Sequence, residues 1–146
     1  MTSATRTPAA AVDEAWALMW QLVSAQRPRF VAVAREHDLF PPQAAALDRL
    51  DPQQPVAMSE LAGKLFCDPS NVTGIVDRLE ARGLVERVSA PHDRRVKMLQ
   101  PTPAGARLRA KVHAAMSAPP AELTALSARD ADALRAILRR ALPADR

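Results

Sequence analysis

The sequence predicts a mostly α-helical fold that includes one small β hairpin. Its 146 residues include 30 alanines and 16 leucines but only 2 isoleucines, 3 phenylalanines and no tyrosine, a composition that favours helices over sheets. Apolar residues recur three and four positions apart along much of the chain, as in helices that bury one face. Because 48% of the residues are hydrophobic and 25% are charged, the chain should bury a core, and we expect residues 1–146 to form a single domain.

The first predicted helix covers residues 12–38. Its apolar or bulky positions alternate in steps of four and three, and they are Val12, Trp16, Met19, Val23, Phe30, Val33 and His37. This stripe is longer than the core of a small domain requires, so we expect a partner chain to cover it and the helix to serve dimerisation. Pro28 removes an amide donor and crowds the carbonyl of Ser24, which predicts a kink near residues 24–28.

Three shorter helices are predicted next. Two cover residues 42–50 and 59–66, and a polar, proline-rich linker separates them. Asp68 is a favoured N-cap and Pro69 suits the first helical position, so a third helix should begin there and end at Gly83. The apolar face of this third helix consists of Val72, Ile75, Val76 and Leu79.

The predicted hairpin lies in the most basic part of the chain. Residues 84–88 and 96–100 are apolar or β-branched and should pair as two short strands around a polar loop. Residues 78–111 contain nine lysines or arginines and three acids, a charge of +6, whereas the other 112 residues sum to −2. Such a basic segment is typical of a nucleic-acid binder, although a solvated basic face would have the same charge.

Two further helices are predicted at the C-terminal end. Thr102 and Pro103 should begin a helix that ends near Ser117, before two consecutive prolines. Ser127 and Asp130 have the spacing of a capping box for a last amphipathic helix. We assign residues 102–142, like residues 12–38, to dimerisation.

Over residues 42–100, two short helices, a tight turn and a basic hairpin follow one another, which predicts a winged helix-turn-helix. The helix that begins after Asp68 would then read the DNA. Its face opposite the core should present small hydrogen-bonding groups and one long cation, namely Ser70, Asn71, Thr73, Gly74, Asp77 and Arg78. Side chains of these types can approach base edges and phosphates in a major groove.

The hairpin tip supplies a second set of candidate DNA contacts. Arg94 and Arg95 can enter a narrow minor groove or bind its phosphates. We expect Asp93 to brace one of these guanidinium groups by a charge-assisted hydrogen bond, with Asp77 as a competing brace. Two arginines alone would more simply be a solvated turn, but their position after a capped helix favours contact with DNA.

Several short motifs follow one another in a specific order. They are Ser59-Glu60-Leu61-Ala62, Val72-Thr73, Val76-Asp77-Arg78-Leu79-Glu80, Gly83-Leu84-Val85, Asp93-Arg94-Arg95 and Thr102-Pro103-Ala104-Gly105. In this order and spacing the chain resembles the multiple-antibiotic-resistance regulator (MarR) family of bacterial transcription factors over most of residues 12–142. The resemblance implies a homodimer that interleaves its first and last helices, two wings on a palindromic operator and control by a small ligand, often an aromatic acid. It also implies that Arg78, Arg94 and Arg95 contact DNA.

These features predict a sequence-specific transcriptional regulator that binds double-stranded DNA as a homodimer and represses transcription. The resemblance implies that a small aromatic or phenolic effector releases it. No catalytic site is expected, because the chain lacks a Ser/His/Asp set, paired carboxylates and a glycine-rich phosphate loop. One cysteine and three scattered histidines give no metal-ligand spacing, so neither metal nor cofactor is expected. The uncharged stretch 15–26 is far shorter than the roughly 18 residues of a membrane span, so we expect a cytoplasmic protein with no membrane partner.

Trp16 and Trp20 are the candidate effector-binding residues, although packing in a core or interface is the simpler interpretation. Cys67 directly precedes a helix start, where a thiol could act as a redox sensor. A small buried residue is the favoured interpretation of Cys67, and a regulator switched by its oxidation is one alternative function. A helical interaction module that does not bind DNA is the other alternative.

Overall fold

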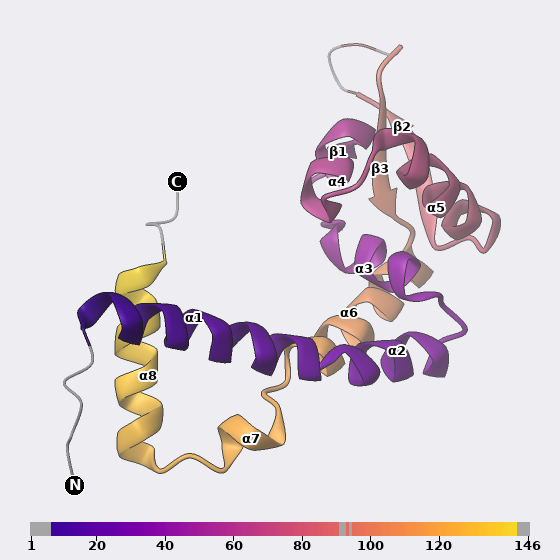
Figure 1. The fold of residues 1–146 in the computed structure, drawn as a ribbon. Coiled ribbons are helices and arrows are strands. Elements are labelled where there is room, and N and C mark those ends of the chain that lie inside the picture. The colour runs from indigo at the N-terminus through magenta and orange to yellow at the C-terminus, as the bar shows by residue number, and fades with distance from the viewer. Residues whose placement is uncertain (1–6, 91–92, 94, 143–146) are drawn as a thin grey trace, which may run out of the picture. The chain divides into compact units, whose positions relative to one another are not determined.

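The computed structural model describes residues 7–90, 93 and 95–142 (Figure 1). The chain divides into two compact units, Met1–Met116 and Ser117–Arg146. The first unit combines helices with a three-stranded antiparallel sheet, and the described part of the second unit is helical. The mostly α-helical fold class is therefore confirmed, and the assignment of residues 1–146 to a single domain stays a prediction.

The first predicted helix is interrupted at Gln26. Its two parts are α1 (Pro8–Ala25) and α2 (Arg27–Glu36). The backbone N–H of Gln26 donates to the Val23 carbonyl at 3.1 Å, one residue short of the helical partner, and the side-chain amide of Gln26 donates to the freed Leu22 carbonyl at 3.3 Å. The interruption lies in the segment where Pro28 predicts a kink, and the helix begins at Pro8 rather than at residue 12.

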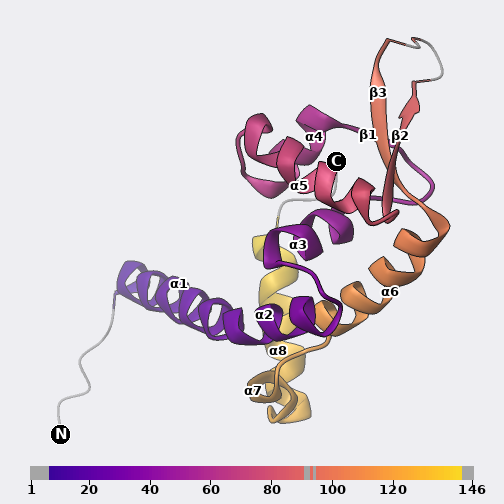
Figure 2. The same cartoon turned by 90° about the vertical axis from the view of Figure 1, so that its right-hand side faces the viewer.

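Three helices and three strands form the middle of the chain, in the order that a winged helix-turn-helix requires. They are α3 (Pro41–Arg49), β1 (Val56–Ala57), α4 (Met58–Leu65), α5 (Pro69–Ala81), β2 (Val85–Ser89) and β3 (Lys97–Pro101). The predicted helices 42–50 and 59–66 and the two predicted strands are each displaced by only one residue. Figure 2 shows the hairpin of β2 and β3 extending beyond these helices.

The sheet contains a third strand that the sequence does not predict. The strand order is β1-β3-β2, with both pairs antiparallel. In β1, Val56 pairs with Leu99 and Ala57 with Met98. A strand of two residues is too short to show an alternating pattern, so no local signal distinguishes it from the linker before it.

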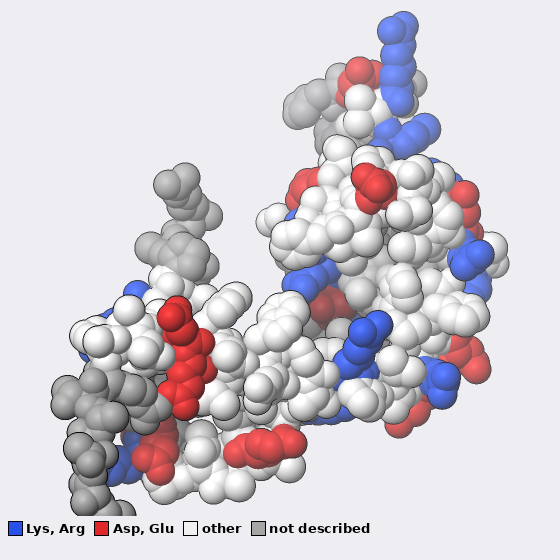
Figure 3. Space-filling view, in the orientation of Figure 1, with Lys and Arg blue, Asp and Glu red and all other residues white. Residues whose placement is uncertain are grey.

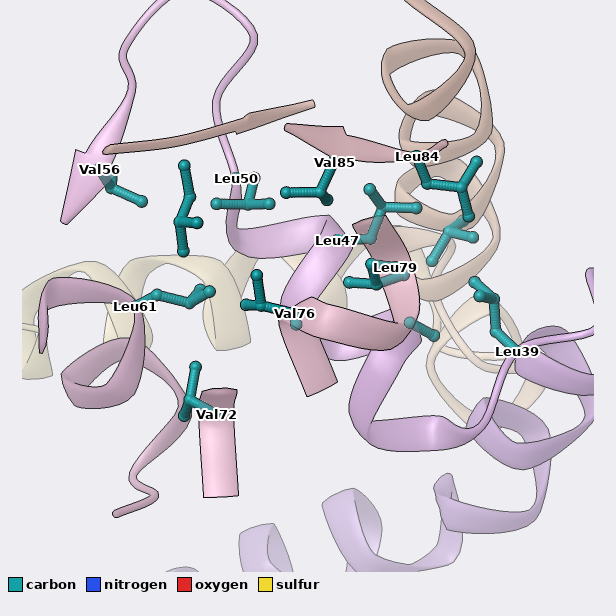
Figure 4. Close-up of a cluster of buried hydrophobic side chains, with 14 of the residues drawn as sticks. Leu39, Leu47, Leu50, Val56, Leu61, Val72, Val76, Leu79, Leu84 and Val85 are labelled. Carbon is teal, nitrogen blue, oxygen red and sulfur yellow. The ribbon is translucent and has the colours of Figure 1, made fainter. Parts of the chain in front are cut away.

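The hydrophobic core of the first unit joins the sheet to α3, α4 and α5 (Figure 4). Its largest fully buried side chains are Leu47, Leu50, Leu61, Leu79, Leu99, Val72, Val76, Val85 and Val112. On α5, Val72, Val76 and Leu79 are buried as predicted, and Ile75 is half-buried. Each fully buried Leu or Val favours folding by about 1.5–3 kcal/mol, so this stripe holds α5 in place and leaves its other face in solvent.

Two glycines determine how α5 connects through the sheet to α6 (Pro103–Ser117). Gly83 has a φ of +66° and ends α5, which confirms the predicted stop. Gly105 lies against Leu84, where a Cβ would be only 1.8 Å from the Leu84 carbonyl oxygen. The N–H of Thr102 donates to that same oxygen at 3.1 Å, and its hydroxyl donates to the Gly83 carbonyl at 2.6 Å. The motif of residues 102–105 thus holds α6 against the start of β2.

The described part of the second unit consists of α7 (Ala121–Thr124), which the sequence does not predict, and α8 (Ala128–Ala141). The Ser127 hydroxyl accepts from the Asp130 N–H at 3.2 Å and donates to the Asp130 carboxylate at 2.7 Å, so the predicted helix start is confirmed. No residue of α8 is buried within the single chain. Its dimerisation role stays a prediction.

Candidate nucleic-acid interface

The outer face of α5 is polar and open to solvent. All six residues predicted for this face are exposed: Ser70, Asn71, Thr73, Gly74, Asp77 and Arg78. The Thr73 hydroxyl donates to the Pro69 carbonyl of its own helix at 3.0 Å. Because the opposite face is held in the core, these side chains are presented together on one side of a rigid helix.

Asp68 occupies the N-cap position of α5 in an extended conformation, but its side chain makes no capping hydrogen bond. Its backbone carbonyl instead accepts from the N–H groups of Asn71 at 3.0 Å and Val72 at 3.3 Å. The predicted helix start is therefore correct and the expected side-chain cap is not. Proline at the first helical position has no N–H group, so the start of the helix has one unpaired donor fewer.

Arg87 on β2 joins the sheet to α5 through a contact that sequence reasoning missed. One of its terminal nitrogens donates to Asp77 Oδ1 at 2.5 Å, and the other donates to the Glu80 carboxylate. The hydrogen bond to Asp77 raises the pKa of Arg87, with support from the charge of Glu80 and against the opposing effect of desolvation. Asp77 therefore braces the guanidinium group of Arg87, whereas a brace of Arg94 by Asp77 lies outside the described residues.

The tip of the hairpin is basic. Figure 3 shows blue lysine and arginine side chains at the end of the hairpin. Asp93 Oδ1 accepts from the backbone N–H of Arg95 at 2.9 Å, so Asp93 supports the turn backbone, and the Arg95 side chain is exposed. Lys97 is also exposed and donates to Ser89 Oγ at 3.0 Å. Arg94 lies outside the described residues, and its contacts with DNA and with Asp93 stay predictions.

The two candidate effector-binding residues are not part of the core of the single chain. Trp16 and Trp20 lie on α1 and are each 64% exposed. A groove of about 880 Å³ lies along the end of α1 and along α2, with Pro28 and Val31 in its lining, but neither tryptophan lines it. Their role in ligand binding stays a prediction.

Cys67 is exposed, so the expectation of a buried residue is wrong. The preceding residue, Phe66, ends α4 in the left-handed region with a φ of 52° and is 96% exposed. The Cys67 thiol donates to the Leu65 carbonyl at 3.3 Å. The geometry of the turn, rather than the apolar character of these two side chains, decides that they face solvent.

Within the described part of the chain, no group of three or more His, Cys, Asp or Glu side chains could hold a metal ion. Every buried side-chain nitrogen or oxygen described there has a hydrogen-bond partner. None of the described helices combines the length and apolar character needed to cross a membrane.

Residues 39–97 match the sequence model of the MarR family. Among curated relatives, the uncharacterized HTH-type transcriptional regulator YsmB of Bacillus subtilis is 34% identical over 76 residues, which is 52% of this chain and 52% of YsmB. The chain spans about half the length of the curated relatives it matches.

Solved structures show the same fold. The multiple antibiotic-resistance repressor (MarR) of Listeria monocytogenes aligns with a TM-score of 0.69 at 17% identity, over 94% of this chain and 96% of that one. A mutant of S. aureus MepR, bound to an oligodeoxyribonucleotide, aligns with a TM-score of 0.59 at 18% identity, over 86% and 94% of the two chains. At these identities the likeness concerns the fold alone, which is a winged helix-turn-helix with flanking helices.

Proposed function

We propose that this protein is a DNA-binding transcriptional regulator of the MarR family and not an enzyme, because residues 39–97 match the sequence model of that family and include a winged helix-turn-helix. The observation that carries the proposal is the exposed polar face of α5, held beside a hairpin with a basic tip. A protein of the same fold, the MepR mutant, is bound to an oligodeoxyribonucleotide, which supports DNA as the partner.

In the proposed complex, α5 enters the major groove and the hairpin contacts the neighbouring backbone or minor groove. Asn71 and Ser70 are short enough to lie close to base edges, and Arg78 reaches bases or phosphates from the same face. Arg95 and Arg94 extend from the hairpin tip to the DNA. The ion pairs of Arg87 keep the hairpin and α5 at a constant separation, so both can bind at once.

We propose that the protein acts as a homodimer. Large apolar side chains of α1 remain exposed in the single chain, including Val12 at 67%, Trp16 at 64% and Val23 at 60%. Burial of such side chains favours association by about 1.5–3 kcal/mol each before the entropy cost is counted. Two identical subunits would present two α5 helices, which suits a palindromic operator with half-sites about 10 bp apart.

We also propose repression of transcription in the cytoplasm, with release by a small aromatic or phenolic effector. Support for repression is the fold shared with the Listeria repressor. Release by a ligand rests on the resemblance of the sequence motifs to the MarR family.

The test begins with selection of bound sequences from random double-stranded DNA, followed by fluorescence anisotropy with the enriched site. Arg78→Ala and Arg95→Ala should each weaken binding by about 1–3 kcal/mol and reduce the salt dependence. Arg107→Ala is the matched control, because Arg107 is exposed on α6, which leaves the sheet at the end opposite the hairpin tip. Failure to enrich any palindrome would favour the alternative of a helical interaction module. Equal affinity of all three variants for an enriched site would remove Arg78 and Arg95 from the contact with DNA.

The exposure of Cys67 favours a second candidate, a regulator whose affinity for DNA changes on oxidation. Its thiol lies in the turn before α5 and could take one oxygen from a peroxide, with release of water, to form a sulfenic acid. DNA affinity before and after peroxide treatment should then change in the wild type and stay constant in Cys67→Ser. Identical affinities for the wild type under both conditions would exclude this mechanism.

A further inference from the structure

Arg82, the residue that caps the C-terminal end of α5, donates to two backbone carbonyls at the end of α2. One of its terminal nitrogens donates to the Asp38 carbonyl at 2.6 Å, and the other donates to the His37 carbonyl at 3.3 Å. Arg82 is exposed and is not among the residues proposed to contact DNA. The proposed function therefore leaves this link between two helices unexplained.

The backbone at the end of α2 presents both carbonyls to Arg82. His37 caps α2, and Asp38 follows in the left-handed region with a φ of 55°. The N–H groups of Asp38 and Leu39 donate back to the last turn of α2 at 3.0 and 2.9 Å, as in a Schellman motif. Carbonyls at a helix end have no partner within the helix, and a cation there also meets the negative end of the helix dipole. The end of α2 is thus a suitable acceptor for one guanidinium group.

The other end of the link is fixed to α5 by the same kind of motif. Gly83 is left-handed, and its N–H donates to the Glu80 carbonyl at 2.8 Å. The N–H of Leu84 donates to the Leu79 carbonyl at 3.0 Å, and both leucines are buried. The backbone that bears the Arg82 side chain therefore moves together with α5.

Buried apolar side chains also join α2 to the winged helix-turn-helix. Val33, Ala34 and Leu39 belong to the core of the first unit, and α2 packs against α3. Apolar contacts have no preferred direction, so packed helices can slide past one another by small amounts. The two hydrogen bonds of a planar guanidinium group do have preferred directions. Arg82 should therefore restrict how α5 is oriented relative to α2.

We propose that Arg82 is a positioning residue that determines which spacing between half-sites the dimer accepts. The inference rests on the homodimer and on the DNA binding proposed above. Because α1 and α2 would join the two subunits, the link from α2 to α5 restrains the separation of the two α5 helices. One base pair more or less between half-sites moves one of them by about 3.4 Å and turns it by about 34–36°. A dimer without the link can follow part of that displacement, whereas the wild type cannot.

Spin labels on Cys67 measure this restraint in the full chain without DNA. Cys67 is the single cysteine of the sequence, is exposed and lies in the turn before α5. A labelled homodimer therefore reports the distance between its two α5 helices in pulsed electron paramagnetic resonance. The distance distribution should be wider in Arg82→Ala than in the wild type, and Arg107→Ala, which removes an exposed arginine of α6, should match the wild type. Equal distributions for the wild type and Arg82→Ala, or a monomeric wild type, would overturn the proposal.

Fluorescence anisotropy then tests whether the restraint determines the spacing. The duplexes are the enriched palindrome, the same site with one base pair inserted or deleted between half-sites, and a site with one half-site scrambled. The wild type should bind the enriched spacing at least about tenfold more tightly than either shifted site, a difference of roughly 1.4 kcal/mol. Arg82→Ala should reduce this preference to about threefold and should bind the single half-site within about twofold of the wild type. Some preference should remain, because Arg29 still joins α2 to α6 through the Ala115 carbonyl at 2.7 Å.

Arg107→Ala removes the same charge and should keep the wild-type preference. An equal loss of affinity for every duplex in Arg82→Ala would contradict a positioning role, and the melting temperature would then show whether the fold or a direct DNA contact is affected. An unchanged preference in Arg82→Ala, or a wild type that is indifferent to spacing, would also refute the proposal. A wild type that binds no DNA would refute the proposed function, while the label distances still decide whether Arg82 holds α5 in place.

Discussion

Replacement of Gly105 with alanine should remove a large part of the stability of the first unit. The added Cβ would lie 1.8 Å from the carbonyl oxygen, 2.8 Å from the carbonyl carbon and 3.2 Å from the Cα of Leu84. All three atoms belong to the backbone, so no side-chain rotation relieves the contact. The start of α6 and the residue before β2 must separate by roughly 1.5 Å in a close-packed interior.

The expected loss follows from the contacts at this junction. Overpacking of a core costs about 1–3 kcal/mol. The separation also weakens the two hydrogen bonds that Thr102 donates to Leu84 and Gly83, each with a net contribution of about 1 kcal/mol. Alanine recovers about 1 kcal/mol through its higher helix propensity. The net destabilisation should be about 2–4 kcal/mol, against a total stability of about 5–15 kcal/mol for a typical domain.

Urea unfolding monitored by circular dichroism measures this loss, with Gly63→Ala as the control. A Cβ at Gly63 would meet no atom within 4 Å, so the control should gain up to about 1 kcal/mol from helix propensity. Both variants must be compared at one protein concentration, because association would add to the apparent stability. Equal stability of the two variants would refute the tight contact between α6 and Leu84.

Four other changes test the remaining contacts. In Gly74→Ala the new Cβ would have no atom within 4 Å, so the free energy of unfolding should rise by about 1 kcal/mol. The same change should weaken DNA binding, and an unchanged DNA affinity in fluorescence anisotropy would show that Gly74 does not contact the DNA. Arg87→Ala should lower the free energy of unfolding by at most about 1 kcal/mol, but it should weaken DNA binding because the hairpin is displaced. A double-mutant cycle with Asp77→Ala that finds no coupling energy would contradict the ion pair between Arg87 and Asp77. Because the Asp77 hydrogen bond raises the pKa of Arg87 above its ordinary value, the stabilisation is present at every pH below that value, and the coupling should not decline between about pH 7 and 10. Ser127→Ala should lower the stability of α8 by about 1 kcal/mol in thermal unfolding, whereas no change would show that the cap is dispensable.

Several helix boundaries in this protein could be predicted from the sequence because their causes are local. Pro28 lacks an amide donor, Pro69 suits a first helical turn and Gly83 adopts a left-handed conformation, and each effect acts within about four residues. The buried stripe of α5 follows from helical spacing, which also determines that its other face is exposed. The exposure of the polar residues of α5, from Ser70 to Arg78, could therefore be predicted from the sequence.

Contacts between distant parts of the chain were decided by the tertiary structure. The partnership of Arg87 with Asp77 and Glu80 and the pairing of β1 with β3 have no local pattern. The exposure of Phe66 and Cys67 likewise depends on one left-handed residue at a helix end, against the apolar character of both side chains. Hydrogen bonds within a helix link near neighbours in sequence, whereas ion pairs, strand pairs and cavities depend on how the folded backbone brings separate segments together.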